Sequence, residues 1–257
     1  LFFCCECFDM MSLQRVICVL IGLIVLAVAK SATAETVVLY EPERGTTPDQ
    51  QGWAYVTKPL LVAKAKRSFS DGVTRLDTMP VMQEWVGFLS RVNLRGFDFR
   101  HPEMPDLNRA TGYTVRFRVC VLEEAHTGKD RAGFCIIVVG NDLQAIELDF
   151  WSGEIWAQSG PKPGRPDEPL FTHSVERSAF DTTQDCVYQL HVFGDRYRLE
   201  ALGKEVLEGP LRDYSSHWHP SYGQANTIFL GDNSSRGSAV VELGRVEVLT
   251  NAGRTPQ

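Results

Sequence analysis

The segment 112–123 limits the fold most strongly, because apolar and polar side chains alternate along it. Its odd-numbered positions are apolar: Tyr113, Val115, Phe117, Val119 and Val121. Its even-numbered positions include Thr114, Arg116 and Arg118. Successive side chains of a β-strand point to opposite faces, so this pattern predicts a strand with one face in a hydrophobic core. An amphipathic helix would instead repeat its apolar residues every three or four positions.

Strand-like runs recur along the rest of the chain at intervals of roughly 8–14 residues. They cover 36–40, 134–139, 144–151, 154–158, 186–193, 196–202, 205–207, 227–230 and 238–249. Turn residues such as Gly140-Asn141-Asp142 and Ser152-Gly153 separate consecutive runs, which is typical of hairpins. Helical periodicity is weak throughout. The pattern therefore predicts an all-β fold, a single sandwich of roughly a dozen antiparallel strands.

The N-terminal region has the pattern of a secretory signal peptide. Arg15 precedes an apolar run at 16–29, and Ala32-Thr33-Ala34 matches a cleavage site. The run is shorter than the roughly 20 apolar residues that a membrane-spanning helix needs, which disfavours the alternative of an uncleaved anchor. We expect residues 1–9 to lie upstream of the true start, 10–34 to be the signal peptide and 35–257 to be one exported domain. The expected location is periplasmic or extracellular, with no membrane span after cleavage.

Charge and cysteine content exclude several classes of protein. The chain carries 26 Lys+Arg against 32 Asp+Glu, a net charge of −6, whereas a nucleic-acid-binding domain is usually basic. Three cysteines, Cys120, Cys135 and Cys186, follow the predicted cleavage site, and none shows the paired spacing of a zinc site. Cys120 and Cys135 lie on runs that we expect to be neighbouring strands, so a disulfide between them is left open.

Several runs resemble a known family of exported bacterial domains. They are 130–134, 146–151, 154–158, 180–183, 209–214 and 229–232. Together they resemble the "choice-of-anchor" domains that are common in cyanobacteria, over about residues 40 to 249. The resemblance implies a concanavalin A-like jelly-roll β-sandwich, the lectin/glucanase fold, and it implies export. It implies no particular ligand.

The clearest candidate for chemistry is the run 147–151. Strand alternation places Glu147, Asp149 and Trp151 on one face. Retaining glycosidases need two carboxylates close together, and glucanases of this fold carry a Glu-x-Asp-x-x-Glu run. Here Ser152 takes the place of the third acid, and Glu154 is the nearest later one. A hydrolase would use Glu147 as nucleophile and Glu154 as a displaced acid.

Two non-catalytic interpretations compete with that one. In the first, Arg116 and Arg118 pair with the two acids on a solvated sheet face. In the second, the acids and arginines bind sugar hydroxyls while an aromatic plane lies against the sugar ring. Trp151 could supply this plane, and so could Trp218 in the aromatic loop 216–222, unless Trp218 packs on the sandwich edge.

Metal sites receive weaker support from the sequence. Asp232 and Asn233 follow a strand-like run and could bind calcium, although the simpler interpretation is an Asx turn. His217 and His219 lack a third ligand. We therefore expect an exported, non-catalytic binding or surface-interaction module with a glycan as its first candidate partner. It would have no cofactor other than calcium. The alternatives are a polysaccharide hydrolase and a structural envelope protein.

Overall fold

The computed structural model describes residues 35–58, 64–80, 85–94, 97–160, 171–216, 219 and 221–250, all within one compact unit, Ala34–Gln257. The segments 1–9 and 10–34 lie outside the described residues, as do His217 and Trp218, so the signal peptide and the role of that tryptophan stay predictions. None of the helices found in the described ranges is long and apolar enough to cross a membrane.

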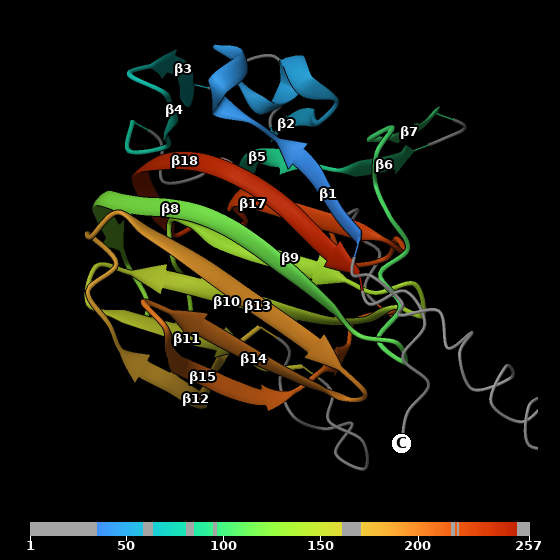
Figure 1. Ribbon diagram of the computed structural model, residues 1–257. Helices are drawn as coiled ribbons and strands as arrows, with labels where there is room; N and C mark the ends of the chain where they lie inside the picture. The colour runs from blue at the N-terminus through green and yellow to red at the C-terminus, as the bar shows by residue number, and fades with distance from the viewer. Residues whose placement is uncertain are drawn as a thin grey trace, which may run out of the picture. The chain divides into compact units, whose positions relative to one another are not determined.

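Two large antiparallel sheets make up the molecule (Figure 1). Sheet A has the order β15 (Lys204–Pro210), β14 (Arg196–Ala201), β13 (Cys186–Phe193), β8 (Tyr113–His126), β18 (Gly237–Thr250), β4 (Val73–Asp77) and β3 (Lys66–Ser70), with β1 (Glu35–Tyr40) paired to β18. Sheet B has the order β12 (His173–Ala179), β11 (Glu154–Gln158), β10 (Gln144–Trp151), β9 (Cys135–Val139), β17 (Thr227–Asp232), β5 (Trp85–Leu89) and β2 (Ala54–Lys58), with β16 (Arg212–Asp213) paired to β10.

The described chain adds only short elements to these sheets. They are a two-stranded ribbon of β6 (Arg91–Leu94) and β7 (Phe97–Arg100) and two 3₁₀ turns, η1 (Pro42–Arg44) and η2 (Pro48–Gln51). The predicted all-β jelly-roll sandwich is confirmed. The alternating segment is β8 at the centre of sheet A, and the two predicted hairpins after it form the meander β9–β10–β11, beside which β12 pairs with β11. The structure has more strands than the expected dozen. Short strands such as β3 and β16 were not predicted, because apolar and polar residues do not alternate clearly in them.

The hydrophobic core fills the space between the inner faces of the two sheets. Phe117 and Tyr188 from sheet A stack on each other, with ring centroids 5.3 Å apart. Phe150 from sheet B meets Tyr188 edge-on, again at 5.3 Å. All three rings are almost completely buried. Edge-to-face and offset contacts of this kind stabilise a core beyond the burial of apolar area.

The Cys120–Cys135 disulfide that the sequence left open is absent, because the two residues do not lie on neighbouring strands as expected. Cys120 belongs to β8 in sheet A and Cys135 to β9 in sheet B. Both are free and buried, as is Cys186. The chain crosses from one sheet to the other between β8 and β9, and the strand pattern alone does not reveal such a crossing.

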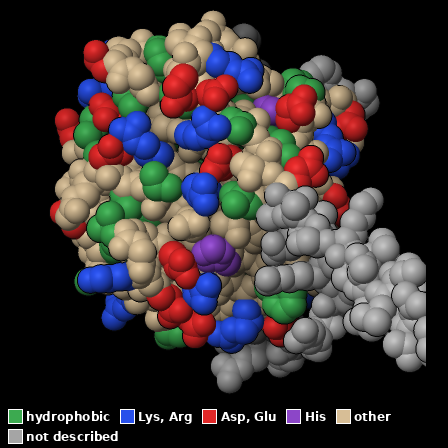
Figure 2. Space-filling model, viewed as in Figure 1, with side chains coloured by type: hydrophobic (Ala, Val, Ile, Leu, Met, Phe, Trp, Pro, Cys, Tyr) green, Lys and Arg blue, Asp and Glu red, His purple; other side chains and the backbone are tan. Residues whose placement is uncertain are grey.

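The outer face of sheet A is open to solvent. Arg116 pairs with Glu247 at 2.5 Å, and Arg118 makes two parallel hydrogen bonds to Asp185. Figure 2, which shows the side of the molecule on which β8 and β13 lie in Figure 1, has basic and acidic side chains interspersed over the surface. This face is a charged, solvated surface of the kind expected for an antiparallel sheet with one side in water.

The outer face of sheet B is covered instead. A second cluster of buried residues lies on it: Leu89, Val92, Cys135, Ile137, Val139, Ala145, Tyr214, Tyr222 and Phe229. Two tyrosines of this cluster come from the segment between β16 and β17, which therefore packs over the sheet. Both faces of the central strands β9, β10 and β17 are thus largely shielded from water, and β10 runs between two apolar layers.

Candidate ligand-binding pocket

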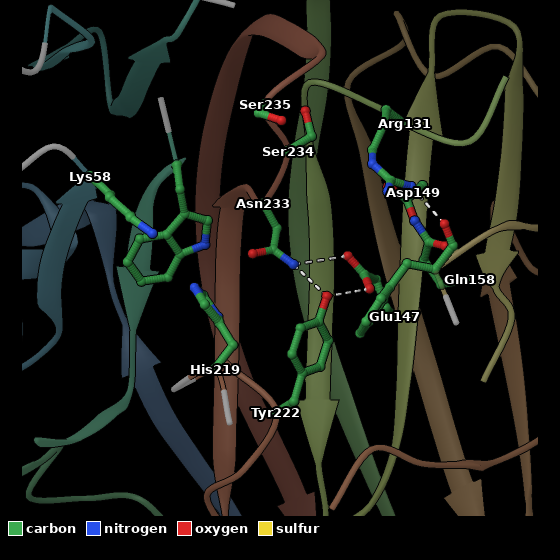
Figure 3. Close-up of a pocket in the computed structure, with 12 residues that line it drawn as sticks. Lys58, Arg131, Glu147, Asp149, Gln158, His219, Tyr222, Asn233, Ser234 and Ser235 are labelled. Carbon is green, nitrogen blue, oxygen red and sulfur yellow. Dashed lines mark hydrogen bonds between the residues drawn. The ribbon is translucent and has the colours of Figure 1, made fainter. Parts of the chain in front are cut away.

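A pocket of about 450 Å³ opens on the outer face of sheet B. Its lining combines charged, amide, hydroxyl and aromatic side chains: Lys58, Trp85, Arg131, Glu147, Asp149, Gln158, Phe171, His219, Tyr222, Asn233, Ser234 and Ser235. The volume lies within the roughly 300–1,000 Å³ of typical small-ligand sites. Figure 3 shows the two acids and Gln158 on neighbouring strands, facing His219, Tyr222 and Asn233 across the cavity.

Two carboxylates from β10 form the floor of the pocket. Glu147 and Asp149 are only 2% and 3% exposed, although they occupy outward-facing positions of their strand. The hydroxyl of Tyr222 donates a hydrogen bond to Oε2 of Glu147 at 2.7 Å. Nδ2 of Asn233 donates to Oε1 of the same glutamate at 3.3 Å and to the Tyr222 hydroxyl. These bonds fix the Glu147 carboxyl group in one orientation (Figure 3).

Burial of the two acids changes their protonation. Loss of water raises the pKa of Glu147, and the hydrogen bonds from Tyr222 and Asn233 offset part of that rise. Loss of water also raises the pKa of Asp149 well above its ordinary value, and the nearby charge of Glu147 raises it further. The positive charge of Arg131 acts in the opposite direction on both groups. The floor can therefore hold a proton at a pH where exposed carboxyl groups are ionised.

Arg131 is itself held in place by backbone contacts. Its Nη1 donates to the carbonyl oxygen of Phe171 at 2.6 Å, and its own carbonyl accepts a bond from Nε1 of Trp151 at 2.8 Å. The side chain of the preceding residue, Asp130, accepts a bond from the backbone nitrogen of His173 at 2.9 Å. The loop between β8 and β9 thereby brings one fixed guanidinium to the edge of the pocket.

Three buried polar atoms of the pocket have no hydrogen-bond partner among the described residues. They are Oδ2 of Asp149, Oε1 of Gln158 and Nε1 of Trp85. The first two are acceptors and the third is a donor. Buried polar groups in proteins are nearly always paired, so unpaired ones in a pocket mark positions where a polar ligand can bind.

An aromatic wall stands beside these atoms. The indole of Trp85 stacks on the ring of Phe229, with centroids 5.7 Å apart and planes 8° from parallel, and His219 meets the indole edge-on at 4.6 Å. The Phe229 ring lies over Gly87, where a Cβ atom would come within 2.5 Å of the ring. Glycine at this strand position is therefore what allows the aromatic wall to lie flat on sheet B.

The structure brings only some of the predicted site residues into this pocket. Glu147, Asp149 and Asn233 line it, whereas Trp151 does not. Trp151 stacks on His126, with centroids 4.3 Å apart, and lines a neighbouring cavity of about 540 Å³ together with His173. Trp218 lies outside the described residues, so its predicted part in binding stays a prediction.

The expected pairing of Arg116 and Arg118 with the two acids is wrong. Both arginines belong to sheet A, where they bond to Glu247 and Asp185. Alternation correctly predicted that they face outward, but β8 and β10 lie in different sheets, so their outer faces point in opposite directions.

Two other predicted residues also lie apart from the pocket. Glu154, the expected displaced acid, bonds to Nε2 of His173 at 2.7 Å and does not line the pocket, so the described residues do not assemble the hydrolase pair. Oδ1 of Asp232 accepts a bond from the backbone nitrogen of Ser234 at 2.9 Å, which is the Asx turn weighed against a calcium site. Of the two predicted calcium ligands, Asn233 lines the pocket and Asp232 does not.

Sequence reasoning missed Cys135, Arg131, Gln158 and Tyr222. The turn after β9 sets a hairpin register in which Cys135 lies directly opposite Asp149. The turn Gly140-Asn141-Asp142 fixes which residues of the two strands lie opposite each other. Counting outward from this turn along both strands could therefore have paired Cys135 with Asp149. Tyr222 could not be found in this way, because it reaches Glu147 from a loop 75 positions further along the chain.

The comparisons with known proteins bear on the fold. No protein-family model matches the chain, and no curated protein matches it. Among solved structures, it is similar to the carbohydrate esterase vb_24B_21 from the Shiga toxin-encoding bacteriophage phi24B, with 11% identity, a TM-score of 0.53, and coverage of 86% of this chain and 100% of that chain. At this identity the likeness concerns the fold alone.

Two further solved structures match with TM-scores below 0.5, and we draw no inference from them. One is a Bacillus subtilis protein of unknown function with a galectin-like fold, at 13% identity and a TM-score of 0.47, covering 86% of this chain and 100% of that chain. The other is domain 4 of AbnA, a GH43 extracellular arabinanase from Geobacillus stearothermophilus solved with arabinotriose, at 12% identity and a TM-score of 0.45, covering 86% and 95%. The strand order places the chain in the class of antiparallel two-sheet jelly-roll sandwiches. The choice-of-anchor resemblance stays a prediction.

Proposed function

We propose that this chain is an exported, non-catalytic carbohydrate-binding module whose ligand enters the pocket on the outer face of sheet B. Export rests on the signal-peptide pattern of residues 10–34. Binding rests on the pocket, because a fold of this class hosts both binding proteins and enzymes and does not by itself define an activity.

The observation that carries the proposal is the set of unpartnered atoms in the pocket. Oδ2 of Asp149 and Oε1 of Gln158 accept hydrogen bonds, and Nε1 of Trp85 donates one. A sugar hydroxyl is both a donor and an acceptor, so the hydroxyls of a glycan that lies across the strands from β5 to β11 can bind all three atoms. The partly exposed Trp85 indole and the Phe171 ring supply apolar surface beside these atoms, to which the C–H face of a sugar can bind.

The proposal is tested by applying the purified chain to a broad glycan array, with calcium and with a chelator. Trp85→Phe keeps the aromatic ring but removes the N–H donor, and Gln158→Ala removes one acceptor. Each variant should weaken binding about three- to tenfold, since one hydrogen bond contributes about 0.5–1.5 kcal/mol. Arg118→Ala on sheet A is the matched control and should bind like the wild type.

Three results would contradict the proposal. The folded wild-type chain could bind no glycan, which would favour a structural or protein-binding role in the cell envelope. The two pocket variants could bind as strongly as the Arg118→Ala control, which would move the site elsewhere. Release of reducing sugar from glucans that disappears in Glu147→Gln would make the protein a hydrolase.

A further inference from the structure

We propose that Cys135, Glu147 and Asp149 form a binding site for one zinc ion, or another divalent ion that accepts thiolate, at the floor of the pocket. One donor atom of each residue lies within 4.8 Å of the other two, and each residue is at most 3% exposed. The test of this proposal needs no glycan, although both proposals assign a ligand to Oδ2 of Asp149.

The register of the β9–β10 hairpin brings the three residues together. Cys135 is the cross-strand partner of Asp149, and Glu147 lies two positions along the same strand as Asp149. Residues two apart on a strand share one face, and hydrogen-bonded neighbouring strands lie about 4.8 Å apart. The three donors are therefore fixed by the backbone of sheet B rather than by a loop.

One of the three residues has a buried oxygen atom that lacks a bonding partner, and a metal ion could supply it. Oδ2 of Asp149 is buried on the pocket floor and has no partner among the described residues. Most buried carboxylate oxygens are hydrogen-bonded or bind an ion, because an unpaired one loses its water without compensation. Glu147 is already oriented by Tyr222 and Asn233, as the ligands of metal sites commonly are by neighbouring groups.

The charges of the site favour a divalent ion. A thiolate and two carboxylates carry three negative charges, of which the ion would neutralise two. Arg131 lines the same pocket and its positive charge acts on both carboxylates, so it would neutralise the third. Counted over the ion and the side chains of Cys135, Glu147, Asp149 and Arg131, the charges would then sum to zero, which lowers the cost of burying them.

The donor set selects zinc over calcium. Calcium binds six to eight oxygen atoms, whereas zinc is commonly held by four ligands drawn from sulfur, nitrogen and carboxylate oxygen. Donor atoms of one sulfur and two oxygen ligands around a tetrahedral zinc ion lie roughly 3.3–3.5 Å apart, so the three groups need to close by about 1.5 Å at most. Three protein ligands leave the fourth position free, and here it would face the pocket.

The test measures metal binding by the full chain after removal of bound metal with a chelator. We expect about one equivalent of zinc per chain by elemental analysis after dialysis and by calorimetric titration. Cobalt(II) in place of zinc should give a thiolate-to-cobalt charge-transfer band in the near ultraviolet, which only sulfur ligation produces. Cys135→Ser should abolish this band, and Asp149→Asn should weaken zinc binding at least tenfold.

Cys186→Ser is the matched control, because Cys186 is also a free, buried thiol but lies on β13 in sheet A. It should leave the stoichiometry and the cobalt band unchanged. Melting curves identify variants that do not fold, and if Cys135→Ser is one of them, Glu147→Gln and Asp149→Asn decide the question.

Two outcomes would overturn the inference. The folded wild-type chain could bind neither zinc nor cobalt(II). Alternatively, zinc could bind equally well to the Cys135→Ser and Cys186→Ser variants and be lost in His219→Ala, which would place the ion at the aromatic loop. Neither outcome would affect the glycan-binding proposal, whose variants Trp85→Phe and Gln158→Ala do not change a metal ligand.

Discussion

The outer faces of the two sheets carry similar residues in very different surroundings. On sheet A, Arg118 and its partner Asp185 are 35% and 54% exposed at the level of their side chains. On sheet B, Glu147 and Asp149 are almost fully buried beneath Tyr222 and the loops around it. Arg118, like the two acids, alternates with core residues along its strand. The alternation fixes which way a side chain points, whereas the segments that pack over the face decide whether it meets water.

That difference has an energetic meaning. A solvated ion pair changes stability little, because water and salt screen it and because two long side chains lose freedom when they pair. A buried carboxyl group costs free energy unless hydrogen bonds or ions compensate it. Sheet B therefore keeps its acids at a cost in stability, and such a cost is typical of a site that binds something.

Removing the cover of sheet B should have the largest effect. Tyr222→Ala removes a buried ring from the second apolar cluster together with the hydroxyl that bonds to Glu147. We expect the free energy of unfolding, measured by urea denaturation, to fall by about 3–5 kcal/mol. Tyr222→Phe keeps the ring and should cost only about 1–3 kcal/mol. Equal losses in the two variants would show that the hydroxyl, and not the cover, is what matters.

The next effect concerns the pH dependence of stability. The pKa of Asp149 is raised in the folded state, whereas in the unfolded chain it is near 3.9. As pH rises above about 4, the unfolded state loses its proton first, so the free energy of unfolding falls until pH passes the folded-state pKa. Asparagine cannot ionise, so Asp149→Asn should escape this fall.

Melting temperatures measured in chelator-containing buffers between about pH 4 and pH 8 check this prediction. The melting temperature of Asp149→Asn minus that of the wild type should increase steadily across the range. A difference that stays constant with pH would mean that Asp149 ionises alike in the folded and unfolded chains. The face of sheet B would then be as well solvated as that of sheet A.

The smallest effect should come from sheet A. Arg118→Ala breaks the bidentate pair with Asp185, yet both groups are partly exposed. We expect a loss below about 1 kcal/mol in urea denaturation, and a smaller one at high salt. A loss as large as that of Tyr222→Phe would remove the contrast between the two outer faces.

The sequence predicted the elements of the fold much better than the site. β8 and the hairpins of β9, β10 and β11 follow from alternation and turn residues, which act over a few positions, whereas β12 was not predicted. The assignment of strands to sheets depends on how the whole chain packs, so Arg118 was placed beside the wrong acids. Asp149 was found because it lies on a clear strand. Tyr222 was missed because nothing in its local sequence indicates that it packs on β10.

The pocket floor and the pocket rim come from different kinds of structure. Glu147 and Asp149 belong to a central strand whose other face carries Phe150 of the core, so a change in the position of the floor would disturb the core as well. His219 and Ser235 on the rim belong to connecting segments outside the strands. Selection for a new ligand could therefore exchange rim residues freely while the floor stays the same. In such a scaffold, specificity can diverge without any change in architecture.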